Sequence, residues 1–149
     1  MLRLLTLFAI LFIGSVPLVR AEPISRSARV VVEPLPVASR RCSLTEREIA
    51  SRTRYVLDAA RWTTEHPTAL DMIHVVVALN DVQSGCIYSV EVSLVREIPS
   101  ARFKTPLLAA TEIESGLGSG GYADVGPDLL NMLERLTKTV VANASEHGH

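Results

Sequence analysis

The stretch from Met72 to Ile98 constrains the fold of this chain more than any other. It holds two apolar runs rich in β-branched residues, separated by the polar turn-formers of residues 80–85. The first run, residues 72–79, is apolar on both faces of an extended chain, which is typical of a central strand. The second run alternates, with an apolar side chain at every second position from Cys86 to Leu94. The stretch therefore predicts a β-hairpin, and the alternating strand predicts a sheet with one buried and one wet face.

Two amphipathic helical patterns flank this hairpin. Residues 43–46 read Ser-Leu-Thr-Glu, a capping box that predicts a helix start, and we expect this helix to run to about Thr64. A second helix is expected from about Asp128. Each has an apolar stripe at helical spacing: Ile49, Thr53, Val56 and Ala60 in the first, and Leu129, Leu133, Leu136 and Val140 in the second.

Two further strands are expected, at residues 29–33 and 105–114. The predicted element order is then β-α-β-β-β-α. This order predicts an α+β fold, a two-layer sandwich in which a four-stranded, mostly antiparallel sheet carries both helices on one face. The chain is long enough for one such domain with a substantial core and too short for two ordinary ones.

The first 21 residues have the pattern of a secretory signal peptide. A basic Arg3 precedes an apolar run, and Val19 and Ala21 supply the small or aliphatic residues before the cleavage point. The alternative is an uncleaved anchor, but the run is shorter than the ~20 residues that span a bilayer. We therefore expect a periplasmic or secreted protein of residues 22–149, with no stable membrane anchor after cleavage.

The two cysteines, Cys42 and Cys86, are expected to form a disulfide in an oxidising compartment. A right-handed crossover between the first two strands places the start of the first helix at the sheet end where the return strand begins. Both cysteines then lie at one end of the domain. No basic run is dense enough to predict a nucleic-acid partner.

The glycine-rich segment 116–121 is the most unusual local feature. Its glycines fit the letters G-x-G-x-x-G, but no parallel β-α-β unit surrounds them, so we interpret the segment as a flexible loop rather than a nucleotide site. His74 is interpreted as structural, and we predict no catalytic, metal-binding or cofactor-binding residues. A possible contact surface is predicted at Gly116, Gly118, Gly120, Gly121 and Tyr122.

The whole pattern resembles a group of small exported bacterial proteins of unknown function. The resemblance is carried by the strand segments VVVEPL, IHVVVALN and YSVEVSLVREI, the helix entry SLTEREI, and the passage from GLGSGG to a terminal helix ending near VVAN. One departure is ATEIESGLG, where members of the group often carry a tryptophan before the glycines. The resemblance implies the fold and a periplasmic location, and it implies no activity.

From these features we expect an exported, non-enzymatic envelope or secreted protein that acts through an unknown protein partner in the cell envelope. The alternative is a small-ligand-binding or enzymatic domain with a pocket near the Gly116–Gly121 segment. A pocket lined by His74 or Tyr122 would favour the alternative, whereas an open outer sheet face or an unpaired strand edge would favour the partner.

Overall fold

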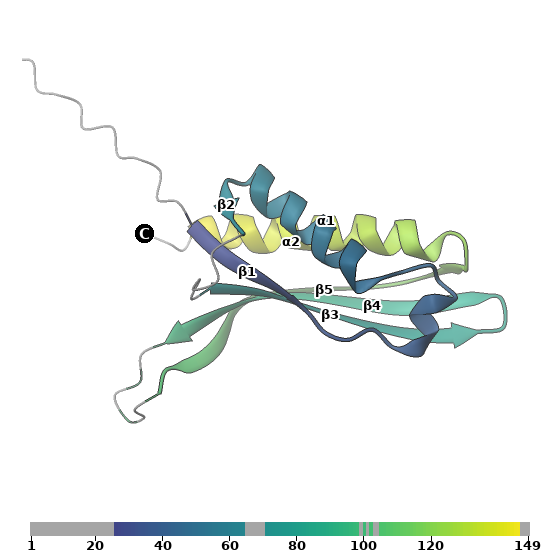
Figure 1. Ribbon diagram of the computed structural model, residues 1–149, viewed down its shortest axis with the longest axis horizontal. Helices are drawn as coiled ribbons and strands as arrows, with labels where there is room; N and C mark the ends of the chain where they lie inside the picture. The colour runs from purple at the N-terminus through teal and green to yellow at the C-terminus, as the bar shows by residue number, and fades with distance from the viewer. Residues whose placement is uncertain (1–25, 65–70, 99, 101, 103–104, 147–149) are drawn as a thin grey trace, which may run out of the picture.

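The chain folds into two layers, a five-stranded sheet with two helices on one of its faces (Figure 1). The computed structural model describes residues 26–64, 71–98, 100, 102 and 105–146; the predicted signal peptide lies outside this range. The elements in chain order are β1 (Arg26–Val32), a short 3-10 helix η1 (Val37–Arg40), α1 (Glu46–Ala59), β2 (Trp62–Thr63), β3 (Asp71–Val82), β4 (Gly85–Ile98), β5 (Leu107–Gly121) and α2 (Val125–Glu146).

The sheet is mixed, with strand order β2-β1-β3-β4-β5. Strand β1 runs parallel to both of its neighbours, β2 and β3, while β3, β4 and β5 form an antiparallel meander. The predicted α+β class with two helices on one face is therefore confirmed. The prediction of four strands in a mostly antiparallel sheet is wrong, because β2 adds a fifth strand and a second parallel pairing.

The hairpin of β3 and β4 is the centre of the sheet, as the sequence predicts. Val82 pairs with Gly85, so the turn consists only of Gln83 and Ser84 and is tighter than expected. The inward side chains of both strands are fully or almost fully buried, and they include Ile73, Val75, Val90, Val92 and Leu94. The β-branched alternation thus produces the buried face directly, because successive side chains of a strand point to opposite faces.

Helix α1 begins later and ends earlier than expected. Its N-cap is Thr45, whose hydroxyl accepts from the Glu48 backbone N–H at 3.2 Å while the Glu48 carboxylate accepts from the Thr45 N–H at 2.9 Å. This capping box lies two residues after the predicted one. At the other end, Arg61 has a φ of 63°, which turns the chain out of the helix. The turn lets Trp62 bury its ring and pair with β1, which creates β2.

Helix α2 is longer than predicted at both ends and packs on β4, β5 and α1. Its predicted stripe is confirmed, since Leu129, Leu133 and Val140 are buried and Leu136 packs partly buried against them. Within the described residues, no helix is long and apolar enough to cross a membrane.

Candidate functional site

The side of the sheet that faces away from the helices, which we call the outer face, is the principal open surface of the fold. Figure 1 shows both helices on the other side. Many residues of the outer face are small or polar, including Ser89, Glu91, Ser115 and Ser119. Exposed apolar side chains lie among them: Ile87, Leu108, Ile113 and Leu117. The outer face is therefore a mixed surface on which apolar groups meet solvent.

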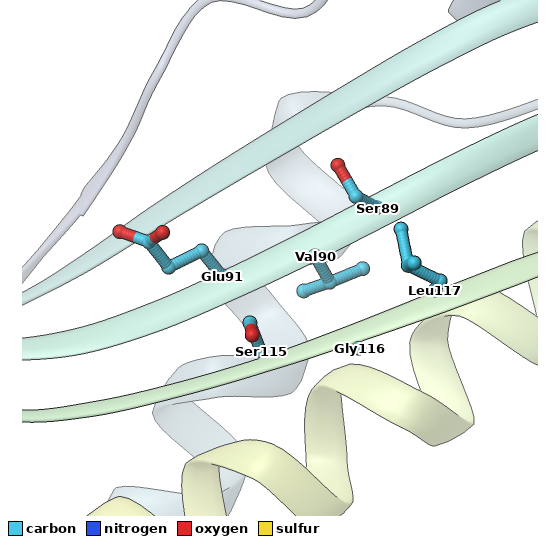
Figure 2. Close-up of a pocket in the computed structure, with 6 residues that line it drawn as sticks. All are labelled: Ser89, Val90, Glu91, Ser115, Gly116 and Leu117. Atoms are coloured by element: carbon cyan, nitrogen blue, oxygen red, sulfur yellow. The ribbon is translucent and has the colours of Figure 1, made fainter.

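A shallow depression of about 410 Å³ lies on the outer face between β4 and β5. Figure 2 shows the side chains of Ser89, Glu91 and Leu117 around it, with the helices behind the strands. Val90, Ser115 and Gly116 complete its lining. The depression offers one carboxylate and two hydroxyls, and its lining contains no histidine, lysine or arginine. It is suited to contact with a side chain of a partner more than to acid–base chemistry.

The glycine-rich segment belongs to β5, so the prediction that it forms a loop is wrong. Gly116, Gly118 and Gly120 alternate along the strand and face the helical layer. A Cβ at Gly118 would lie 2.3 Å from Cζ of Tyr88, and one at Gly116 would lie 2.6 Å from Sδ of Met132. The glycines therefore make room for an aromatic ring and a helix that pack close to the strand. The side of these glycines where a side chain would lie faces the helices and not the outer face. Their role as a contact surface stays a prediction.

Tyr122 follows the end of β5 and belongs to a polar cluster. Its hydroxyl donates to the Asp81 carboxylate and lies 2.8 Å from the Val82 carbonyl oxygen. The guanidinium of Arg41 donates to Oδ2 of Asp81 at 2.6 Å. The hydrogen bond to Asp81 raises the pKa of Tyr122, and the Asp81 charge raises the pKa of Arg41. Because all three groups satisfy one another, the cluster closes one end of the sheet rather than activating a nucleophile.

The disulfide between Cys42 and Cys86 lies at the same end of the sheet. Both residues are fully buried, and the bond ties the segment before α1 to the first residues of β4. The expected pairing and its expected place at one end of the domain are present in the structure. Within the described residues no cysteine is free.

His74 lies on the outer face of β3. Its Nε2 is 2.7 Å from Oε1 of Glu33, which follows β1. The pair joins two adjacent parallel strands, in agreement with the structural role predicted for the histidine. In the described part of the chain, no three histidine, cysteine or acidic side chains gather where they would hold a metal ion.

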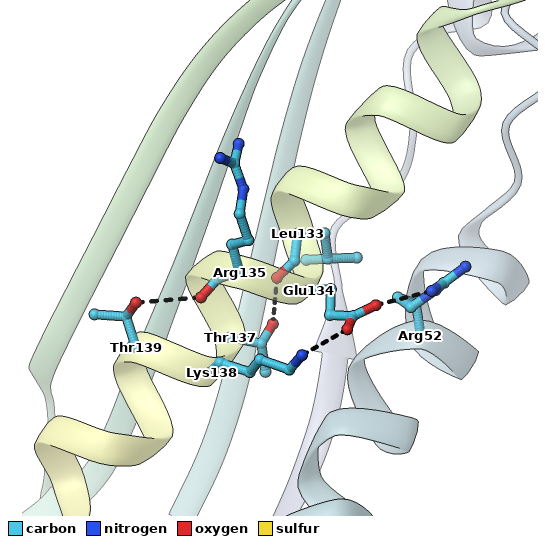
Figure 3. Close-up of polar contacts among 7 residues, drawn as sticks. All are labelled: Arg52, Leu133, Glu134, Arg135, Thr137, Lys138 and Thr139. Atoms are coloured by element: carbon cyan, nitrogen blue, oxygen red, sulfur yellow. Dashed lines mark hydrogen bonds and ion pairs between the residues drawn. The ribbon is translucent and has the colours of Figure 1, made fainter.

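The helical layer is closed by polar contacts between its two helices. Figure 3 shows Arg52 of α1 and Lys138 of α2 on either side of Glu134; the Arg52–Glu134 distance is 2.8 Å and the Lys138–Glu134 distance is 2.7 Å. Arg135 and Thr139 lie on the opposite side of α2 (Figure 3). The hydrogen bonds from Lys138 and Arg52 lower the pKa of Glu134. This surface is a helix–helix seam with its charges paired.

Replacing Glu134 with glutamine is expected to lower the free energy of unfolding at pH 7 and to leave it unchanged in acid. A carboxyl group whose pKa is lowered by folding stabilises the fold above its unfolded pKa, and this contribution is lost as the pH falls through the folded value. The difference between wild type and Glu134→Gln should therefore shrink as the pH falls below about 4 and vanish once the pH is below the lowered pKa of the folded state. Urea unfolding at pH 7 and pH 3 measures it, with Glu146→Gln as the control at the exposed end of α2. Equal differences at both pH values would contradict the expectation.

Sequence reasoning missed the depression and most residues around it. The signal was present in residues 113–119, where Ile113, Ser115, Leu117 and Ser119 alternate with glutamate and glycine. That period of two is typical of a strand with one open face, but the glycines concealed it.

Comparisons with known proteins identify no family for this chain. No family model matches the chain, and no curated protein matches it. Among solved structures the chain is similar to a minor lipoprotein from Acinetobacter baumannii, with 10% sequence identity and a TM-score of 0.34, over 83% of this chain and 87% of that chain. A likeness of this extent identifies neither a family nor a function, and the resemblance to small exported bacterial proteins stays a prediction.

Proposed function

We propose that this chain is an exported envelope or secreted protein that catalyses no reaction and acts by binding another protein through the outer face of its sheet. The observation that carries the proposal is the open outer face itself, on which Ile113 and Leu117 are 58% and 78% exposed. Apolar side chains grouped on a surface favour association, because contact with a partner removes them from water.

The export part of the proposal is supported by two features. Residues 1–21 have the signal-peptide pattern, and the domain carries one buried disulfide, Cys42–Cys86. Disulfides persist in the periplasm and outside the cell and are rare in the cytosol. These two features support an exported location, and on that basis we propose a protein partner in the cell envelope.

Site-specific photo-crosslinking tests the binding face. A photoreactive amino acid at Ser89, in the centre of the outer face, is expected to capture a reproducible protein partner from an envelope fraction, identified by mass spectrometry. The same amino acid at Lys138, which is exposed in the helical layer, is the matched control and should capture none. Equal capture at both positions, or capture only at Lys138, would contradict the proposal.

The second candidate function is binding of a small ligand in the depression beside Gly116. The depression favours it because Ser89, Glu91 and Ser115 place three polar side chains around one hollow. A thermal-shift screen of the oxidised protein distinguishes the two functions: a ligand that raises the Tm of the wild type but not of a Glu91→Gln variant would support the ligand site.

A further inference from the structure

Strand β5 ends the sheet with a long edge that no other strand of the described residues covers. It has 15 residues, and within the described part of the chain its one partner strand is β4. Proteins protect such edges with proline, lysine, inward charges, bulges or very short strands. Residues 107–121 contain no proline and no basic residue, their inward charges are Glu112 and Glu114, and the one irregularity lies opposite Leu94 and Val95. Residues 115–121 have none of these protecting features. Among the described residues, this edge is therefore open to another strand from Ser115 to Gly121.

The pairing pattern shows which backbone groups of β5 point to this edge. The two-residue turn makes Val82 and Gly85 a hydrogen-bonded pair, so the odd-numbered residues of β4 bond to β3 and the even-numbered ones bond to β5. The pairing of β1 with β3 supports this assignment. The Glu33 N–H donates to the Val75 carbonyl, so the odd-numbered residues of β3 bond to β1 and the even-numbered residues of β3 bond to β4. In β5 the residues paired with the even-numbered positions of β4 are also even-numbered. Residues 113, 115, 117 and 119 therefore direct their N–H and C=O groups outward.

We propose that a second copy of this chain occupies the edge, with the two β5 strands antiparallel across a two-fold axis at Ser115. This register sets Ile113 of each copy opposite Leu117 of the other. These are highly exposed apolar side chains of β5 on the outer face. Cross-strand apolar pairs of this kind stabilise an antiparallel ladder.

The charges of β5 are compatible with this register and exclude three neighbouring ones. An axis at residue 112, 113 or 114 would set a glutamate of one copy opposite a glutamate of the other, which destabilises a strand pair. An axis at Ser115 instead sets Glu114 opposite Gly116 and Glu112 opposite Gly118. No like charges then face each other directly.

The helical layer has room for this pairing. Helix α2 packs on both β4 and β5. An axis midway between these strands would lie half a strand spacing inside the edge. With strands about 4.8 Å apart, the two α2 helices of the pair would lie about 10 Å apart, a normal distance for packed helices. The result is a continuous ten-stranded sheet with all four helices on one face and an outer face of twice the size.

Sedimentation equilibrium of the oxidised mature chain tests the pairing. We expect a concentration-dependent dimer. Ser115→Pro removes an outward N–H while keeping every bond between β4 and β5, and it should raise the dimer dissociation constant about tenfold or more, because the central residue pair loses its hydrogen bonds. Ser115→Thr keeps the N–H and is the matched control. Circular dichroism of each variant verifies that the monomer remains folded.

A second variant keeps the test decisive if Ser115→Pro does not fold. Leu117→Lys places a charge on an exposed side chain of the monomer and should also weaken the dimer.

A cysteine cross-link tests the register directly. Ser115→Cys should form an intermolecular disulfide on mild oxidation, whereas Ser89→Cys, one strand inside the edge, should not. A chain that is monomeric at all concentrations, or a dimer unaffected by both Ser115→Pro and Leu117→Lys, would overturn the proposal.

Discussion

Replacing Cys42 and Cys86 together with alanine is expected to lower the Tm of the oxidised protein by roughly 10 °C. The disulfide joins residues 44 positions apart, and a cross-link over a loop of that length stabilises a fold by about 3 to 4 kcal/mol in the chain-entropy model. Both cysteines are fully buried, so the loss of the bond is not offset by new contacts with water.

Serine at either position should have a larger effect than alanine. A hydroxyl in place of the buried sulfur needs a hydrogen-bond partner there, and a buried hydroxyl without one costs a further 1 to 3 kcal/mol, roughly. Calorimetry of the Cys42→Ala/Cys86→Ala and Cys42→Ser/Cys86→Ser variants separates the cross-link from the buried hydroxyl. The reduced wild type serves as the control and should melt near the alanine variant. A Tm equal to that of the oxidised wild type would show that the bond contributes nothing.

Replacing Gly118 with alanine is expected to destabilise the fold by about 1 to 3 kcal/mol, the usual cost of inserting a group into a filled space. The added Cβ would lie 2.3 Å from Cζ and 2.4 Å from the hydroxyl oxygen of Tyr88. Tyr88 is buried under the helical layer, and burial with the nearby Asp128 charge raises its pKa. The ring therefore has little freedom to move away from the new methyl group.

A double-mutant cycle with Tyr88→Leu tests this explanation. The smaller side chain removes the ring that the methyl group meets, so Gly118→Ala should cost less in the Tyr88→Leu background than in the wild type. Ser119→Ala, next in the strand and exposed on the outer face, is the control and should change the free energy of unfolding little. Equal costs of Gly118→Ala in both backgrounds would refute the contact with Tyr88.

The elements with a regular period were predictable from the sequence. The hairpin of β3 and β4 follows from alternation of apolar residues, and α2 follows from one stripe of aliphatic side chains at helical spacing. The end of the domain that holds Cys42 and Cys86 was also predictable, because the handedness of the first crossover places both residues there.

Strand β2 was not predictable from any pattern. It has two residues, Trp62 and Thr63, which sit where helical periodicity continues along the chain. It forms because burying Trp62 against the start of β1 is more favourable than one more helical turn. Arg26 packs over the indole ring at 5.8 Å and adds to this contact. Such a tertiary contact between distant residues overrides local helix propensity.

The candidate site was predicted only in outline. The outer face was expected from the polar positions of β4, but the contribution of β5 was lost because glycine disfavours strands on average. In this fold glycine is favoured at these positions because a larger residue would collide with the Tyr88 ring or with Met132. Which ring lies above which glycine is decided by the register between β4 and β5, and a single sequence does not contain that register.

The contact between the first strand and the last helix determines how the domain is presented to its surroundings. The Arg26 guanidinium donates to the carbonyl oxygen of Ala144, so β1 begins and α2 ends at the same end of the domain (Figure 1). The disulfide Cys42–Cys86 lies at the other end, where β4 begins. A partner or tag linked to the start of β1 and one linked to the end of α2 would therefore be joined to the domain at the same end. Immobilising the protein on a surface through either end would therefore give the same orientation, with the Tyr122 cluster farthest from the surface. Linking the two ends and opening the chain at Gln83–Ser84 would reverse that orientation without altering a single strand pairing.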